Sequence, residues 1–222
     1  IIEEVPEVDA VLGTTSYGDI LKAIREAMEG KHFQEFKDID YLPEKLGKRV
    51  LTTGGHFGYL KIAEGCDKHC TYCIIPKLRG KFRSVPMERL VTQAKEMAEE
   101  GVKELILVAQ ETTVYGTDIY GKKSLHILLK ELCKIKGIRW IRVLYCYPEE
   151  IYDELIQTMK EEKKICHYLD LPIQHASDRI LKRMGRRTTQ AELVEIVNKL
   201  RREIPDIVLR TTLPPDPGYS SH

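Results

Sequence analysis

The sequence predicts an α/β protein in which a partial parallel (β/α) barrel follows the last βα unit of a preceding α/β domain. After residue 58, five strand-like apolar runs alternate with helix-like periods. That alternation implies right-handed βαβ crossovers and a parallel sheet. A doubly wound sheet fits the same periods. Polar residues after nearly every predicted strand favour the barrel, because such side chains would ring one mouth.

The composition is that of an ordinary globular protein. The 222 residues are 42% hydrophobic and 31% charged, which allows a sizeable core. Thirty-five basic and thirty-four acidic side chains give a net charge of +1, so there is no electrostatic argument for direct nucleic-acid binding. Without a run of eighteen apolar residues or a signal-peptide pattern, we expect a cytoplasmic protein with no membrane partner. Because the chain begins without Met, we also expect a fragment.

Residues 1–45 are expected to be the C-terminal remnant of an N-terminal domain. A short strand is predicted over residues 8–12, and apolar residues at helical spacing predict a helix from Ile20 to Met28. Ser16 with Asp19 suggests the helix N-cap. The pattern then breaks over residues 31–55, which predicts a linking or wrapping segment, and the linker between domains is placed at 46–57.

The core is predicted to span residues 58–213. Its strands are expected over residues 59–63, 104–109, 140–145, 168–173 and 207–213. Its helices are expected from Pro86 to Gly101, over residues 125–132 and 151–159, and from a capping box of Thr189 and Glu192 onward. The nearly continuous apolar run 104–109 predicts a strand buried on both faces.

Polar side chains follow the predicted strands. They are Gln110, Glu111, Arg142, Tyr145, Gln174, His175, Arg210 and Thr211. Parallel α/β proteins bind ligands outside the carboxyl ends of their strands, so these residues are candidates for an active site. The alternative for each is a strand-end residue that satisfies backbone groups.

Three cysteines fall at the spacing C-x-x-x-C-x-x-C, as Cys66, Cys70 and Cys73. Clustered thiolates of this kind indicate zinc or an iron-sulfur cluster before disulfides. A structural zinc needs a fourth ligand, which here would be His69. A 4Fe-4S cluster held by three cysteines instead leaves one iron open to a small molecule. A purely structural cluster is the remaining alternative.

Three stretches carry a resemblance to a known family: residues 59–66, 107–118 and 169–178. They resemble the methylthiotransferases of the radical S-adenosylmethionine (SAM) superfamily, and are most similar to the branch that modifies a ribosomal protein. The tRNA-modifying branch usually has Gln-Asn-Val-Asn at positions 110–113 and Gln-Ser-Gly-Ser at 174–177, where this chain has Gln-Glu-Thr-Thr and Gln-His-Ala-Ser.

The resemblance implies a barrel of the radical SAM type and a reaction. A 4Fe-4S cluster on the three cysteines would cleave SAM, and the resulting radical would abstract hydrogen from an unactivated carbon. A methylthio group would then be added to the β-carbon of an aspartate in a small-subunit ribosomal protein. The implied partners are that protein and an electron donor such as flavodoxin or ferredoxin. A tRNA methylthiotransferase and a non-catalytic metal-binding module are the alternatives.

The resemblance also implies residue roles. Tyr72 would contact the adenine of SAM, or simply pack beside the cluster. Gln110, Glu111, Gln174 and Arg210 are candidates for the SAM and substrate pocket. We assign no catalytic acid or base from the sequence.

A basic run follows the cysteine loop, and three further cysteines lie outside it. Lys77, Arg79, Lys81 and Arg83 would meet an acidic ribosomal surface, or form a solvated face. Cys133, Cys146 and Cys166 are expected to be buried structural thiols.

The chain departs from the family at both ends. The three N-terminal cysteines that hold a second cluster in these enzymes, and the small C-terminal β-barrel, are expected outside it. Residues 214–222 form an atypical tail with three prolines, where the relatives continue a strand. We therefore expect this chain to bind one cluster and cleave SAM without completing methylthiolation.

Overall fold

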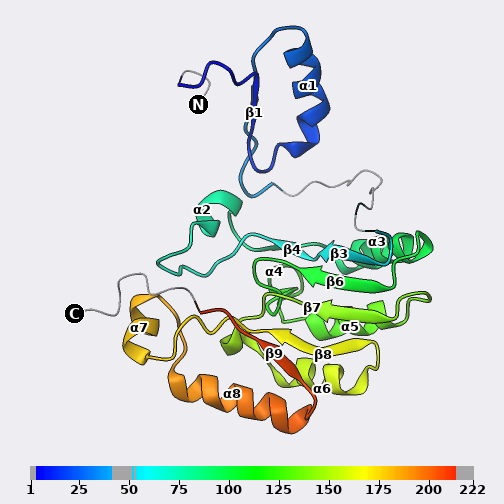
Figure 1. Ribbon diagram of the computed structural model, residues 1–222, viewed down its shortest axis with the longest axis vertical. Helices are drawn as coiled ribbons and strands as arrows, with labels where there is room; N and C mark the ends of the chain where they lie inside the picture. The colour runs from blue at the N-terminus through cyan, green and yellow to red at the C-terminus, as the bar shows by residue number, and fades with distance from the viewer. Residues whose placement is uncertain (1–3, 42–51, 53, 214–222) are drawn as a thin grey trace.

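A small βαβ unit precedes the main sheet in the computed structural model, which describes residues 4–41, 52 and 54–213. Strands β1 (Ala10–Leu12) and β2 (Phe33–Glu35) are parallel neighbours, joined through the 3-10 turn η1 (Tyr17–Asp19) and helix α1 (Ile20–Met28). Figure 1 shows this unit at one end of the molecule. The predicted helix is confirmed at both ends.

Two expectations for this unit are wrong. Ser16 does not cap α1, because Asp19 occupies the N-cap position and the Ser16 Oγ accepts the backbone N–H of Lys37 at 2.9 Å. The expected linking segment 31–55 contains β2, whose three residues are too few to show a period of two. Pairing with β1 supplies its hydrogen bonds.

Within the described residues, five parallel strands form the main sheet. In spatial order they are β3 (Phe57–Lys61), β6 (Glu104–Val108), β7 (Trp140–Val143), β8 (Ile165–Asp170) and β9 (Val208–Arg210). The spatial order follows the chain order and never reverses. A doubly wound sheet would reverse at a switch point, so the partial barrel is confirmed.

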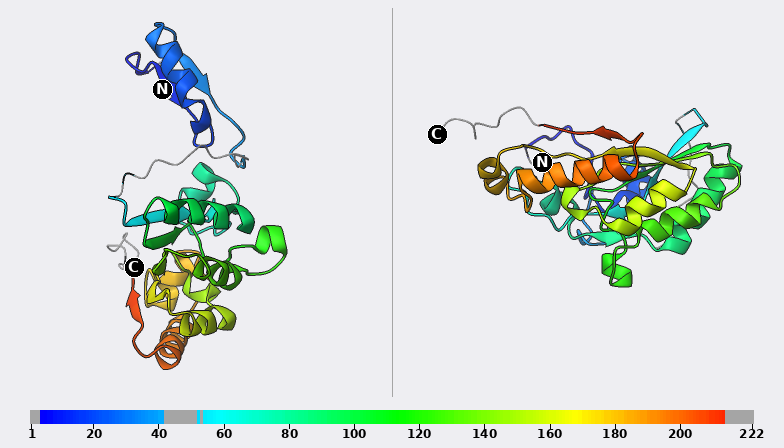
Figure 2. Two further views of the ribbon diagram at one scale, coloured as in Figure 1. Left: turned by 90° about the vertical axis from the view of Figure 1, so that its right-hand side faces the viewer. Right: turned by 90° about the horizontal axis from the view of Figure 1, so that it is seen from below.

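Four amphipathic helices cover one face of this sheet (Figures 1 and 2). They are α3 (Met87–Glu99), α5 (Leu125–Cys133), α6 (Asp153–Glu161) and α8 (Gln190–Glu203). Leu105 and Leu107 of β6 are fully buried against this layer, whereas Ile106 and Val108 on the other face are only half-buried. The expectation that this strand is buried on both faces is therefore wrong, because the inner face of a partial barrel is not closed over.

The first predicted core strand is divided between two sheets. β3 begins at Phe57 and ends at Lys61. The next residues form β4 (Ala63–Glu64), which pairs antiparallel with β5 (Arg83–Ser84) across the cysteine loop. The predicted strand 140–145 ends at Val143, because Tyr145 adopts a left-handed backbone conformation with φ of 59°.

The later boundaries also shift. β8 lies three residues earlier than predicted, and β9 ends at Arg210 rather than at residue 213. α6 begins two residues later than predicted, after the 3-10 turn η2 (Pro148–Glu150). Three short helices were not predicted: α2 (Ile75–Arg79), α4 (Thr117–Tyr120) and α7 (Asp178–Arg183).

The capping box at the start of α8 is confirmed. The Thr189 side chain accepts the backbone N–H of Glu192, and the Glu192 carboxylate accepts the backbone N–H of Thr189 at 2.8 Å. Among the described residues, no helix is long and apolar enough to cross a bilayer. The tail predicted at 214–222 and most of the linker predicted at 46–57 lie outside the described residues.

Candidate functional site

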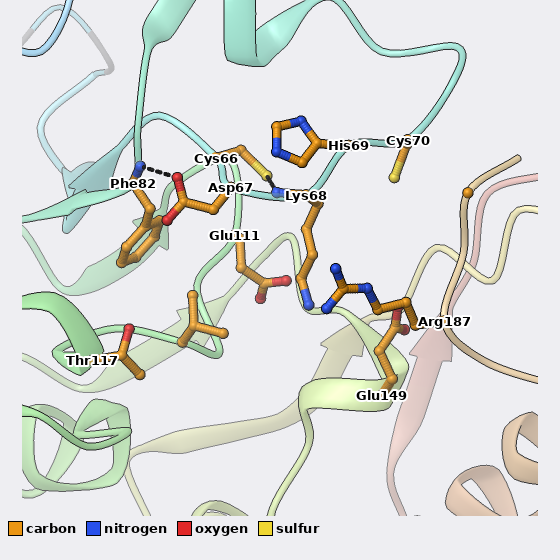
Figure 3. Close-up of a pocket in the computed structure, with 12 residues that line it drawn as sticks. Cys66, Asp67, Lys68, His69, Cys70, Phe82, Glu111, Thr117, Glu149 and Arg187 are labelled. Atoms are coloured by element: carbon orange, nitrogen blue, oxygen red, sulfur yellow. Dashed lines mark hydrogen bonds between the residues drawn. The ribbon is translucent and has the colours of Figure 1, made fainter.

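The cysteine loop leaves β4 through a turn that only glycine accommodates. Gly65 has a φ of +78°, and a Cβ there would lie 2.7 Å from the carbonyl oxygen of Gly80. The Cys66 N–H donates to that same carbonyl at 3.2 Å. The Asp67 carboxylate accepts the backbone N–H of Phe82 at 3.0 Å (Figure 3). The strand pair β4–β5 thus fixes the first cysteine.

The second half of the loop packs on the turn after α7. The Thr71 N–H donates to the Met184 carbonyl at 3.0 Å, and its hydroxyl donates to the Arg183 carbonyl at 3.1 Å. A tight turn follows, in which the Cys73 N–H donates to the Cys70 carbonyl at 3.0 Å. The two halves of the cysteine motif are therefore held by segments about a hundred residues apart in the chain: Cys66 and Asp67 by Gly80 and Phe82, and Thr71 by Arg183 and Met184.

The three thiols of the loop are free and largely shielded. Cys66 and Cys70 are 5% and 6% exposed, and Cys73 is half-buried. Burial raises the pKa of the Cys66 thiol to about 11, although the Lys68 N–H donates to its sulfur at 3.4 Å and opposes the shift. Such a thiol ionises when a bound cation compensates its charge, which is the chemistry of a metal ligand.

This donor set fits an iron-sulfur cubane better than a zinc ion. Cys70 and Cys73 lie close enough to Cys66 for their charges to raise its pKa. Yet within the described part of the chain, no three His, Cys, Asp or Glu side chains gather around a single ion. A tetrahedral zinc would need Cys66, His69, Cys70 and Cys73 to converge on one point. Three thiolates spaced around a larger cluster need not do so.

A cavity of ≈ 220 Å³ lies between this loop and the carboxyl ends of the strands (Figure 3). Cys66, Lys68 and Cys70 line it from the loop, and Glu111 lines it from the segment after β6. Glu149, after β7, closes another side. A small ligand there would contact both the cysteine loop and the strand ends.

Glu111 is the buried carboxylate of this cavity. It is 1% exposed, and its Oε1 accepts the backbone N–H of Thr113 at 2.9 Å as well as the Thr113 hydroxyl. Its Oε2 is buried and accepts no hydrogen bond from the described residues. Burial raises the pKa of Glu111 to about 7, although the Thr113 bonds oppose the shift. A carboxylate with one unpaired oxygen in a cavity can accept hydrogen bonds from an ammonium group.

Gln110 does not line this cavity. Its amide donates to the Glu64 carboxylate at 3.0 Å, and Lys61 and Arg79 bind the other oxygen of Glu64. The Gln110 Oε1 is buried without a hydrogen bond from the described residues. The structure therefore separates Gln110 from its sequence neighbour Glu111.

Cys73, Tyr72, Gln174 and Arg210 also do not line the cavity. Gln174 has a left-handed φ of 68°, and its N–H donates to the Thr212 carbonyl at 3.1 Å. The exposed Arg210 guanidinium pairs with Asp170 at 3.3 Å. Tyr72 is 42% exposed, and burial raises its pKa to about 12. The adenine contact expected of Tyr72 stays a prediction.

Three other strand-end candidates satisfy neighbouring groups instead. Arg142 lies within β7, where it pairs with Glu104 at 2.7 Å. The Thr211 hydroxyl donates to the Leu171 carbonyl at 2.8 Å, and His175 Nδ1 accepts the Ser177 N–H at 2.9 Å. For Thr211 and His175 the backbone-satisfying alternative is the better interpretation.

Sequence reasoning missed several charged residues around the cavity. Lys68 forms an ion pair with Glu150, which also pairs with Lys123 at 2.8 Å. Glu149 pairs with the buried Arg186 at 3.1 Å. Only Lys68 could have been recognised from the sequence, because it lies inside the cysteine motif. The fold alone brings the other charged residues close to the cavity.

The basic run and the other cysteines are only partly as expected. Arg79 and Arg83 pair with Glu64 and Asp40, at 3.8 Å and 3.0 Å, while Lys77 and Lys81 are exposed. A ribosomal contact for this run stays a prediction.

Cys133 and Cys146 are buried as expected, but Cys166 is only half-buried in β8.

Comparison with known families gives a match over most of the core. The sequence model of the Radical SAM superfamily matches residues 60–219. The match includes all three cysteines of the loop and Glu111.

Curated relatives match nearly the whole chain. A protein of Lachnoclostridium phytofermentans named ribosomal protein uS12 methylthiotransferase RimO is 67% identical over 213 residues, which is 96% of this chain and 48% of the relative. A protein of the same name from Clostridium botulinum is 55% identical, over 94% of this chain and 47% of the relative. The chain thus spans about half the length of the curated relatives it matches.

Solved structures support the fold. The radical SAM methyltransferase TsrM from Kitasatospora setae, with tryptophan substrate and a SAM analogue bound, matches with a TM-score of 0.56 and 17% identity, over 72% of this chain and 30% of that one. The cobalamin-dependent SAM radical enzyme OxsB matches with a TM-score of 0.56 and 16% identity, over 69% of this chain and 23% of that one.

Proposed function

The chain belongs to the radical SAM superfamily, and from that membership we propose that it forms the central part of a methylthiotransferase acting on ribosomal protein uS12. The observation that carries the proposal is the placement of the loop with Cys66, Cys70 and Cys73 over a cavity at the carboxyl ends of parallel strands. The identity of 67% to a named uS12 methylthiotransferase supports the substrate assignment.

The three cysteines would hold a 4Fe-4S cluster, and the cavity would hold SAM. When bound, the cluster would supply the electron that cleaves SAM and so permits hydrogen abstraction from the β-carbon of a uS12 aspartate. The methylthio group that replaces this hydrogen would be built from a separate sulfur donor and the methyl group of a second SAM. The electron would come from a donor such as flavodoxin or ferredoxin. The protein itself supplies binding, orientation and exclusion of water.

Several residues of the chain have defined tasks in this scheme. Glu111 would accept hydrogen bonds from the SAM ammonium group through its unpaired Oε2. Thr113 orients that carboxylate by binding its other oxygen. The Lys68–Glu150 ion pair restrains the loop beside the cavity.

The experiment that tests this function uses the full-length protein. It is reconstituted anaerobically with iron and sulfide, reduced, and offered SAM with either a uS12 peptide containing the target aspartate or tRNA. We expect the peptide to gain a methylthio group in place of hydrogen, as measured by mass spectrometry, and the tRNA to remain unmodified. Modification of the tRNA alone would overturn the proposed substrate.

A further inference from the structure

Arg186 is a buried cation beside the cysteine loop to which the mechanism above gives no task. Its side chain is 1% exposed. The Nη2 group donates to the Glu149 carboxylate at 3.1 Å and to the Pro172 carbonyl at 3.4 Å. The Nε and Nη1 groups are buried and make no hydrogen bond of good geometry within the described residues, although the guanidinium lies close enough to the Tyr72 hydroxyl to oppose the rise of its pKa. Burying two guanidinium donors without good acceptors costs free energy, so we expect the positive charge at this position to serve a function.

Tyr147 connects Arg186 to the second cysteine of the loop. The guanidinium carbon of Arg186 lies 4.2 Å from the centroid of the Tyr147 ring, in cation–π geometry. The hydroxyl of Tyr147 lies 3.6 Å from the Sγ of Cys70, within hydrogen-bond range for sulfur. A positive charge therefore lies one aromatic ring away from the Cys70 sulfur.

The backbone around Arg186 fixes this arrangement. Gly185 has a φ of +71°, and a Cβ there would lie 3.0 Å from the carbonyl oxygen of His69. The preceding residue, Met184, accepts the N–H of Thr71. The turn that carries Arg186 thus contacts the loop on both sides of Cys70.

We propose that Arg186 is a positioning residue for the iron-sulfur cluster, which orients Tyr147 against the Cys70 sulfur and favours the reduced cluster through its buried charge. Reduction adds one negative charge to a cluster, and a fixed positive charge in a shielded site stabilises that charge. The groups around ligating sulfurs tune redox potentials in the same way. This inference rests on the proposed function, because it presupposes a cluster on the three cysteines.

Glu149 allows the charge to be tested separately from the packing. Replacing Arg186 leaves the carboxylate of Glu149 uncompensated, whereas replacing Glu149 leaves the guanidinium uncompensated. An electrostatic role therefore predicts shifts of opposite sign. A merely structural role predicts damage in the same direction from both changes.

The experiment is a redox titration of the reconstituted chain without substrate, monitored by electron paramagnetic resonance, on the wild type and on Arg186→Gln, Arg186→Lys, Glu149→Gln and the Arg186→Gln/Glu149→Gln double variant. Lys182→Gln, which removes an exposed charge from α7, is the matched control. At a fixed potential, we expect Arg186→Gln to lower the reduced-to-oxidised ratio about tenfold, a shift of about 59 mV for one electron. We expect Glu149→Gln to raise the ratio, and the double variant, which lacks both charges, to lie between the two single variants.

Each outcome decides the matter. If Arg186→Gln does not fold, Glu149→Gln and the charge-retaining Arg186→Lys test the proposal instead. Glu149→Gln must then still raise the reduced-to-oxidised ratio relative to Arg186→Lys. Unchanged ratios in a wild type that binds its cluster would overturn the role of Arg186 and leave the proposed function intact. A wild type that holds no 4Fe-4S cluster would overturn both.

Discussion

A Cβ on Gly65 would overlap the carbonyl oxygen of Lys81, so the residue before the first cysteine must be glycine. The close approach exists because β4 and β5 pair antiparallel on either side of the cysteine loop. This pairing brings both ends of the loop together and fixes the direction in which Cys66 enters the site.

Gly65→Ala is expected to destabilise the fold and to weaken cluster retention. The left-handed backbone alone costs a non-glycine residue about 1–2 kcal/mol, and the overlap with Lys81 adds to that cost. Urea unfolding and iron content after reconstitution measure the two effects. Gly121→Ala is the matched control, because Gly121 has a φ of +69° with no heavy atom within 4 Å of the added Cβ. Equal losses of stability and of iron in the two variants would show that the close approach of Gly65 to Lys81 does not contribute to either.

Glu111→Gln is expected to weaken SAM binding. A hydrogen bond to a charged group contributes about 1.5–3 kcal/mol, which corresponds to roughly a 10- to 150-fold increase in the dissociation constant. Calorimetric titration of the cluster-loaded protein with SAM measures the effect. Glu88→Gln, an exposed substitution on α3, should leave the constant unchanged. Wild-type affinity in Glu111→Gln would remove this residue from the binding site.

The raised pKa of Glu111 also predicts how stability depends on pH. Burial raises this pKa from its usual 4.5 to about 7, so the folded state binds more protons than the unfolded state between these values. The free energy of unfolding of the metal-free wild type should therefore fall as the pH rises from 4.5 to 7, by up to about 3 kcal/mol from this group. Glu111→Gln should lose that component of the slope. Parallel pH profiles of wild type and variant would contradict it.

Thr189→Ala is expected to cost about 1 kcal/mol of stability, because it removes the side-chain acceptor that caps α8. Thr189→Ser keeps an equivalent hydroxyl and should retain most of the capping energy. Chemical unfolding of the three proteins measures the difference. If the serine variant loses as much as the alanine variant, the hydroxyl does not act as a cap.

The sheet and the long helices could be predicted because the spacing of their apolar residues is visible in the local sequence. The repeated helical spacing in α3, α5 and α8 and the apolar run of β6 are sufficient to indicate parallel βαβ units. β2, β4 and β5 were missed because they are two or three residues long and depend on pairing with a partner strand. Tertiary pairing, not local preference, sets their limits.

The part of the candidate site that the sequence indicates is the part whose chemistry lies in one short motif. The cysteine spacing predicts metal ligands, which stays a prediction, and Glu111, which follows an apolar strand, lines the cavity beside the cysteine loop. Gln110 and Arg210 do not line this cavity, because they bind Glu64 and Asp170, which come from other strands. The direction of a side chain at a strand end depends on such partners, and the spacing of apolar residues in the sequence does not reveal them.

The measurement that tests the central claim most directly is iron, acid-labile sulfide and zinc per chain after anaerobic reconstitution. We predict about four irons and four sulfides in the wild type, loss of the cluster in Cys70→Ala, and retention in Cys166→Ala, whose thiol lies in β8 away from the loop. Stoichiometric zinc without sulfide, or a cluster that survives in Cys70→Ala, would contradict a radical SAM site on these three cysteines.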